Sequence, residues 1–277
     1  MSSPYENQVM DHYSRVARDV GLSSSCTMED EYIREKESRA IHSLIEAVLI
    51  ANSESRQRIL DVGCGNGFTL RMLAEFARGR ALVDRLELLG VEKNPDLHDL
   101  AVKMNEGLPV VIQKGDILLA DTLAFGQASI DVCISQRVLI NLLNAEHQKL
   151  ALANLVDLVK PGGYLLLIEC FQDGMDNLNA ARNEFGLEPN LPAIHNLYLQ
   201  NDVLQIPHME EDAPGGWRVP PNIFSTHYYV QRVLQNAMRG SVIERNSNFV
   251  RFFSAALPEA VGNYSPLRIH CFRKRTA

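Results

Sequence analysis

Residues 59–68 read ILDVGCGNGF and place three glycines within five positions, directly behind an apolar run. Gly63, Gly65 and Gly67 have no Cβ, so the backbone can turn sharply there and come close to a ligand. Asp61 lies just before them. In open α/β sheets, ligands bind beyond the carboxyl ends of the strands. The stretch therefore predicts a strand, a ligand-binding loop and a helix.

Strand and helix patterns alternate along the chain on both sides of this loop. Apolar runs separated by helices of 10–15 residues are typical of a parallel sheet that is covered on both faces. We therefore expect an α/β fold with a doubly wound, mostly parallel seven-stranded sheet. The expected strands are 58–62, 86–92, 109–113, 129–135, 163–170 and, near the end of the chain, 267–275.

The chain divides into four segments in this interpretation. Residues 1–54 contain two helical patterns and form an N-terminal helical cover. Residues 55–171 form the ligand-binding core. Residues 172–214 are rich in proline and polar residues and read as an insertion or lid on the substrate side. Residues 215–277 return to the core sheet, after a helical pattern at 227–238.

Composition and charge exclude several classes of protein. The 277 residues carry a net charge of −7, which opposes a duplex nucleic-acid binder. No apolar run reaches the roughly 18 residues of a membrane span. The five cysteines are scattered without a C-x-x-C pair, which favours reduced thiols over disulfides or a zinc site. We expect a cytoplasmic protein that needs no metal and binds no membrane.

Carboxylates at successive strand ends indicate the ligand. The spacing G-x-G-x-G differs from the dinucleotide pattern G-x-G-x-x-G, and Asp61 would repel a pyrophosphate but suits an ammonium group. Glu92 ends the next strand, where an acid can accept both hydroxyls of a ribose. Asp116 is placed to accept from an exocyclic amine, and Ile117 offers an apolar surface to a base. Together they predict a nucleoside linked to an amino acid.

This arrangement resembles the class I S-adenosylmethionine-dependent methyltransferases. The resemblance rests on LDVGCGNG, Glu92, GDI and VKPGGYLLLIE, in order, over roughly residues 55–175. It implies S-adenosylmethionine as cofactor and further cofactor contacts at Tyr13, Arg34, Cys64, Asn66, Lys93, Ser135, Gln136 and Arg137. A nicotinamide-dependent oxidoreductase and a non-catalytic interaction module are the alternatives from other classes.

The sequence signals for the acceptor-binding part of the site are less specific. The fourth strand ends at Ser135, without an Asn-Pro-Pro-Tyr motif or a metal-binding aspartate. By resemblance, this favours metal-independent methyl transfer to oxygen of a small molecule or a sugar-like glycan precursor, with a small amine as the alternative. An oxygen acceptor needs a general base, most often histidine.

His195 is the first candidate for this base and His227 the second, whereas His147 reads as a solvated helix residue. A homodimer is compatible with the sequence. The candidate substrate contacts are Glu169, Asp173, Asn196, Tyr198 and Tyr228.

Overall fold

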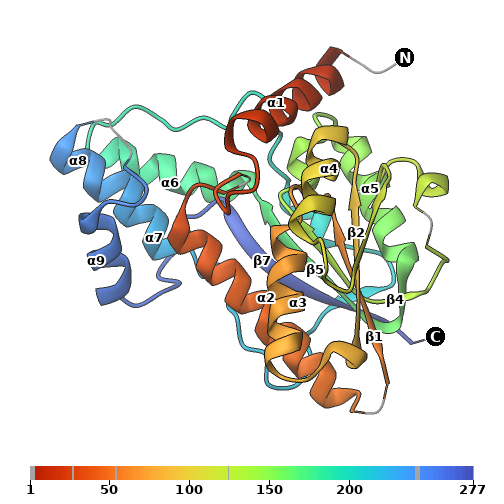
Figure 1. The fold of residues 1–277 in the computed structure, drawn as a ribbon. Helices are drawn as coiled ribbons and strands as arrows, with labels where there is room; N and C mark the ends of the chain where they lie inside the picture. Colours follow the sequence, from red (N-terminus) through yellow and green to blue (C-terminus); the bar gives the residue numbers. More distant parts are fainter. Residues whose placement is uncertain (1–3, 27, 54, 124, 241–243, 277) are drawn as a thin grey trace.

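The computed structural model describes residues 4–26, 28–53, 55–123, 125–240 and 244–276 (Figure 1). Within these ranges, seven strands form one sheet in the order β3-β2-β1-β4-β5-β7-β6. The first five strands are parallel, and β7 is antiparallel to both of its neighbours. The expected doubly wound sheet is confirmed. The strands are β1 Gln57–Val62, β2 Leu86–Glu92, β3 Val110–Lys114, β4 Ile130–Gln136, β5 Val159–Cys170, β6 Met209–Glu211 and β7 Leu267–Lys274.

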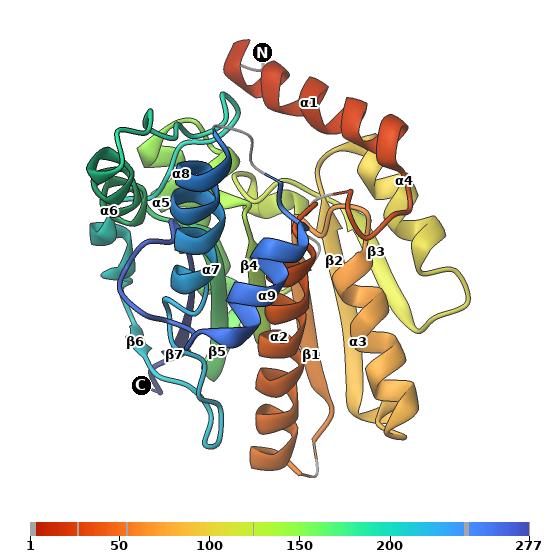
Figure 2. The ribbon, with the colours of Figure 1, turned by 90° about the vertical axis from the view of Figure 1, so that its left-hand side faces the viewer.

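Three helices and the sheet form most of the core. Helices α2 and α3 pack side by side on one face, and α5 lies on the other (Figures 1 and 2). The core strands are buried almost along their whole length, as expected for a sheet covered on both faces. These helices and α4, which follows β2, span α2 Glu31–Ala51, α3 Phe68–Gly79, α4 Pro95–Met104 and α5 Ala145–Leu158.

Polar residues fix where these helices begin. The side chains of Asp30, Asn94 and Asn144 accept hydrogen bonds from the first backbone N–H groups of α2, α4 and α5. Such caps satisfy donors that have no partner inside the helix. Pro95 follows Asn94 at the first helical position, where its missing N–H costs nothing. Two of these caps lie at the carboxyl edge of the sheet, because α4 and α5 follow β2 and β4.

Helix α1 stands apart from the core. It spans Pro4–Val20 and crosses above the carboxyl ends of the strands (Figure 2). Its apolar contacts belong to a small separate cluster of Ala17, Cys26 and Leu97, with Tyr13 and Val16 packed against it. By contrast, α2 is part of the main core through Ile41, Leu44 and Ile45. Within the expected cover of residues 1–54, α1 alone has the position of a lid.

The segment after β5 departs from the expectation. Residues 172–214 contain a 13-residue helix, α6 Gln172–Glu184, and also β6, which pairs with β7 at the sheet edge. The sheet therefore resumes before residue 215. The helical pattern at 227–238 forms α7 Ser225–Tyr229 and α8 Gln235–Arg239, joined by a turn of π-helix at Val230–Leu234. With α9 Asn248–Ala256 they form a lobe beside the sheet (Figure 1).

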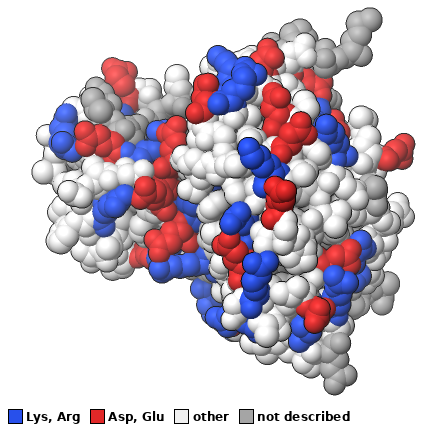
Figure 3. Space-filling model, in the orientation of Figure 1, with Lys and Arg blue, Asp and Glu red and all other residues white. Residues whose placement is uncertain are grey.

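The face of the molecule drawn in Figure 3 shows no dominant charge. On the face drawn in Figure 3, basic and acidic side chains are interspersed rather than gathered by sign. No helix in the described part of the chain is long and apolar enough to span a membrane.

Candidate functional site

The glycine loop takes the conformation that its sequence predicts. Gly63, Gly65 and Gly67 all have positive φ, between 58° and 79°, where residues with a Cβ are strained. A Cβ on Gly63 would also approach Val138 Cγ2 to 2.6 Å. Gly67 directly precedes α3 and packs against α4, so it shapes the loop without facing the ligand side. The loop can therefore be narrow enough for a ligand to lie against its backbone.

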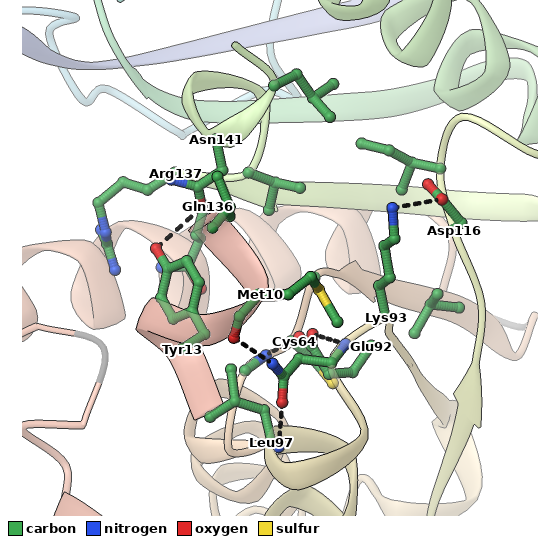
Figure 4. Close-up of a pocket in the computed structure, with 18 of the residues that line it drawn as sticks. Met10, Tyr13, Cys64, Glu92, Lys93, Leu97, Asp116, Gln136, Arg137 and Asn141 are labelled. Carbon is green, nitrogen blue, oxygen red and sulfur yellow. Dashed lines mark hydrogen bonds and ion pairs between the residues drawn. The ribbon is translucent and has the colours of Figure 1, made fainter. Parts of the chain in front are cut away.

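A cavity of about 520 Å³ opens beside this loop (Figure 4). Its walls come from the carboxyl ends of β1 to β4, from the connection between β4 and α5, from α2 and from α1. The sequence-predicted residues that line it are Tyr13, Arg34, Asp61, Gly63, Cys64, Gly65, Asn66, Glu92, Lys93, Asp116, Ile117, Gln136 and Arg137. Residues separated by more than 120 positions thus meet around one space.

Asp61 is buried at the base of this cavity. Its side chain is not hydrogen-bonded to any described residue, and it is 2% exposed. Burial and the nearby Glu92 raise the pKa of Asp61 to about 7, although Arg137 and Arg34 act in the opposite direction. A buried carboxyl without a hydrogen-bond donor is costly even with two arginines nearby, so this position suits a cationic ligand group.

Glu92 is fixed by two backbone donors. Gly65 N donates to its Oε2 and Asn94 N to its Oε1, each at 2.8 Å. Burial raises the pKa of Glu92 to about 7 in spite of these bonds. Each carboxylate oxygen has more than one lone pair, so the group can still accept two hydroxyl donors from a ligand.

Asp116 lies at the far end of the cavity with Ile117. Its Oδ2 is 2.8 Å from Lys93 Nζ, and its Oδ1 accepts from Leu118 N at 3.0 Å (Figure 4). Lys93 also pairs with Glu6 of α1. These two hydrogen-bonded carboxylates raise the pKa of Lys93 although burial lowers it. Asp116 thus keeps acceptor capacity toward the cavity while Lys93 joins it to α1.

Two arginines approach the opposite end. Arg34 of α2 lies over the Phe68 ring at 5.0 Å and donates to Ser24 O at 3.1 Å. Burial and the charge of Arg137 lower the pKa of Arg34 to about 10. Arg137 follows β4 with φ of 58° and pairs with the fully buried Glu37. This end of the cavity therefore suits a carboxylate, which Arg34 can bind.

Helix α1 closes the cavity through polar contacts. Tyr13 Oη donates to Asn141 Oδ1 at 2.9 Å, and Asn94 Nδ2 donates to Met10 O at 3.1 Å. The His12 ring stacks on His195, with centroids 3.8 Å apart. These contacts join α1 to three separate loops, so it covers the cavity without belonging to the main core.

A known protein family matches the part of the chain that forms most of this site. Residues 59–163 match a family model described as a methyltransferase domain. This part of the chain is a methyltransferase domain. The seven-stranded sheet matches the fold of the class I, S-adenosylmethionine-dependent methyltransferases, and S-adenosylmethionine is the cofactor. The resemblance seen in the sequence is thus confirmed.

Solved structures share the fold of this methyltransferase. A putative sarcosine dimethylglycine methyltransferase from Galdieria sulphuraria aligns with a TM-score of 0.54 and 15% identity, over 97% of this chain and 98% of that one. The N-methyltransferase NodS from Bradyrhizobium japonicum WM9, solved with S-adenosyl-l-homocysteine, aligns with a TM-score of 0.50 and 14% identity, over 95% and 97%. A comparison with curated protein sequences finds no significant match.

Two predicted residues at the ends of β4 and β5 have structural roles in the methyltransferase. Ser135 is fully buried and donates to Glu169 Oε1 at 2.7 Å rather than facing the cavity. Glu169, also fully buried, accepts from the backbone N–H groups of Val138 and Leu139. Glu169 therefore holds the loop after β4, and we correct its assignment as a substrate contact. The sequence could not separate these roles, because both are polar residues at strand ends.

Two other predicted residues, His227 and Asp173, lie away from the cavity. His227 is 1% exposed, with Nε2 2.9 Å from Asp30 Oδ2 and Nδ1 2.8 Å from Ser254 Oγ. It joins α7 to α2 and α9, so the structure does not place it as a base. Asp173 pairs with Arg268.

The remaining acceptor-side residues lie around the end of β5. Tyr228 is buried and Tyr198 packs against the main core, but neither lines the cavity. Asn196 Oδ1 accepts from Asn141 Nδ2 at 2.8 Å, beside the Tyr13 contact. Burial and the adjacent His12 lower the pKa of His195 to about 4.

Several lining residues are absent from the sequence interpretation. His147 is exposed, as its sequence context indicates, and it also lines the cavity from the first turn of α5. The Asn144 cap before an apolar helix is a signal that could have marked this turn. No such signal marks the others, which are Glu6, Val9, Met10, Phe68, Thr69, Val91, Asn94, Leu97, Gly115, Leu118, Val138, Asn141, Leu142 and Leu143. No group of three potential metal ligands occurs among the described residues.

Proposed function

We propose that the methyltransferase binds S-adenosylmethionine across this cavity, with its amino-acid end at Asp61 and Arg34. The single observation that carries the proposal is Asp61, a buried carboxyl with a pKa of about 7 that no side chain or backbone group of the described residues hydrogen-bonds. An ammonium group would supply the missing charge, and Arg34 would hold the adjoining carboxylate. Glu92 would accept from the ribose hydroxyls, and Asp116 from the adenine amine.

The remaining cofactor contacts follow from the loop. Cys64, Gly65 and Asn66 would present backbone to the ligand, and Ile117 would cover one side of the base. Gln136, held by Thr69 Oγ1 at 2.7 Å, would lie along the amino-acid end with Tyr13. When bound, the cofactor supplies an electrophilic methyl group on a sulfonium centre. The chain's own residues align it and exclude water, which are the main contributions to such a displacement.

The acceptor of the reaction is a small molecule in our proposal, and no metal takes part. Helix α1 lines the cavity, and its Tyr13 donates to Asn141 beyond the end of β4, which favours an enclosed acceptor over a folded macromolecule. The role of residues 172–214 as a cover on the acceptor side remains part of the proposal. The sequence favoured transfer to oxygen, and a glycan precursor as the acceptor.

The two histidines that the sequence offers as bases favour nitrogen as the atom methylated. A hydroxyl acceptor needs a base whose pKa lies near the working pH. His195, with a pKa of about 4, is poorly matched, and His227 is bonded at both ring nitrogens. A neutral amine attacks without such a base. We therefore propose a small amine as the acceptor, with a hydroxyl as the second candidate.

The test has two stages. Calorimetric titration with S-adenosylhomocysteine, repeated on Asp61→Ala and Glu92→Ala, examines the cofactor site, and loss of binding in both variants is expected. Pairs of small amines and the corresponding alcohols are then compared by the rate at which S-adenosylhomocysteine forms. Amine turnover that exceeds alcohol turnover supports the proposal. Alcohol turnover that needs His195 would contradict it.

The cellular setting remains a prediction. All five cysteines are buried and free, which supports a reducing, cytoplasmic location. A homodimer, and the absence of nucleic-acid and membrane partners, remain expectations from the sequence. Sedimentation measured with and without cofactor tests whether the protein forms a homodimer.

A further inference from the structure

Arg232 lies in the π-helical turn between α7 and α8. Turns of this kind are rare and often occur at functional sites. Its Cζ is 5.1 Å from the centroid of the Tyr228 ring. Its Nε is buried without a hydrogen-bond partner, and no carboxylate of the described residues lies within ion-pair distance of it. The guanidinium is thus packed against an aromatic ring with its charge unbalanced.

Three other arginines of the interior have partners for their guanidinium groups. Arg137 pairs with Glu37 and Arg268 with Asp173. Arg182 donates to the carbonyls of Glu188 and Arg232 itself. Arginine seldom enters a protein interior unless it is paired, because losing hydration is costly. The contrast indicates that the partner of Arg232 is not part of the described chain.

The position of Arg232 relates it to the reacting end of the site. Cys170 ends β5, next to β4 and Arg137 in the sheet. Burial and Glu169 raise the pKa of Cys170 to about 12, although the charges of Arg137 and Arg232 act in the opposite direction. Burial raises the pKa of Tyr228, and the charges of Arg232 and Arg137 again act in the opposite direction. Cys170 and Tyr228 therefore lie within electrostatic reach of both arginines.

Backbone contacts place Tyr198 near the same end of β5. Leu199 N donates to Cys170 O at 2.9 Å, which positions Tyr198 at the end of β5. The π-turn also contacts α6, α7 and α9, so Arg232 is held by the lobe and not by a free loop. Arg232 as a whole is only partly buried, so a ligand can approach its side chain from solution.

We propose that Arg232 binds an anionic group of the methyl acceptor, a carboxylate or a phosphate, beside Tyr228 and Tyr198. Arg137 is already neutralised by Glu37, so an acceptor anion gains more by pairing with Arg232. A guanidinium matches both anions because it can donate two parallel N–H bonds to their oxygens. The inference rests on the proposed function, since it concerns the acceptor of that reaction.

The experiment compares the wild type with Arg232→Gln and with Arg218→Gln, which removes an equal charge from an exposed position. Each protein is saturated with S-adenosylhomocysteine and titrated calorimetrically with acetate, phosphate or chloride at constant ionic strength. We expect saturable binding of acetate or phosphate, but not chloride, to the wild type and to Arg218→Gln. Binding to Arg232→Gln should be at least tenfold weaker, and Arg232→Lys should recover part of it. The stronger of the two anions identifies the group.

The cofactor titration separates the two proposals. All variants should bind S-adenosylhomocysteine within about twofold of the wild type, which also shows that they are folded. If the wild type does not bind it, the cofactor proposal fails. Intact cofactor binding without anion binding, or equal anion binding by Arg232→Gln, overturns the acceptor inference and leaves an adventitious ion only. Cofactor binding lost in Arg232→Gln alone would move Arg232 to the cofactor site and overturn it as well.

Discussion

Cofactor affinity should depend on pH because of the two buried carboxyls. Asp61 and Glu92 have pKa values of about 7 in the free protein, and both must be ionised to bind an ammonium group and ribose hydroxyls as we propose. A group with a pKa of 7 is about one tenth ionised at pH 6 and nine tenths at pH 8. If one carboxyl governs binding, affinity falls roughly tenfold between pH 8 and pH 6, which is about 1.4 kcal/mol. If both do, the fall approaches a hundredfold.

Titration calorimetry with S-adenosylhomocysteine measures this effect directly. At pH 7, binding should release close to half a proton for each carboxyl, which is visible as a dependence of the heat on the buffer's ionisation enthalpy. Asp61→Asn should weaken binding at pH 8 and remove its share of the pH dependence, while Glu92→Gln keeps the share of Asp61. Wild-type affinity that is constant from pH 6 to 8 would refute the reasoning, as would wild-type affinity in Asp61→Asn.

Four further outcomes are expected. The folded-state pKa of Asp61 is raised from 3.8 to about 7, so its unfavourable effect on stability is absent below pH 4 and grows toward pH 7. Asp61→Asn should therefore raise the unfolding free energy of the free protein at pH 8 by at most about 4 kcal/mol, which a higher melting temperature would show. Tyr13→Phe removes the bond to Asn141, worth about 1 kcal/mol, and should speed cofactor release about fivefold in stopped-flow experiments. Glu169→Gln should lower the unfolding free energy by about 2–3 kcal/mol in urea while KM for the acceptor stays constant. His195→Ala should leave kcat within about threefold, and a loss beyond tenfold with unchanged cofactor binding would restore it as the base.

The sequence predicts well what depends on neighbouring positions in the chain. Glycines behind a strand and acids at strand ends are local patterns, and parallel strands bring their ends to one edge. The positions of Asp61, Glu92 and Asp116 in one cavity follow from that geometry. The expected sheet follows from the same alternation of apolar runs.

Roles set by distant contacts could not be predicted in this way. Glu169 and His227 look like candidates for chemistry in the sequence, but their partners lie 27 to 197 positions away. β6 escapes notice because it has only three residues and follows His208, which has positive φ. The amphipathic pattern of α1 indicates a helix but not which loops it covers.

The reversed direction of β7 determines how the protein can be attached to a support. Because β7 runs against β1 to β5, Lys274 lies at the edge of the sheet opposite the cavity. A tether joined there would leave the cavity and α1 facing solution. One joined before α1 would pull on the helix whose Glu6 pairs with Lys93. Surface-based binding measurements on this methyltransferase are therefore best made with the tether after β7.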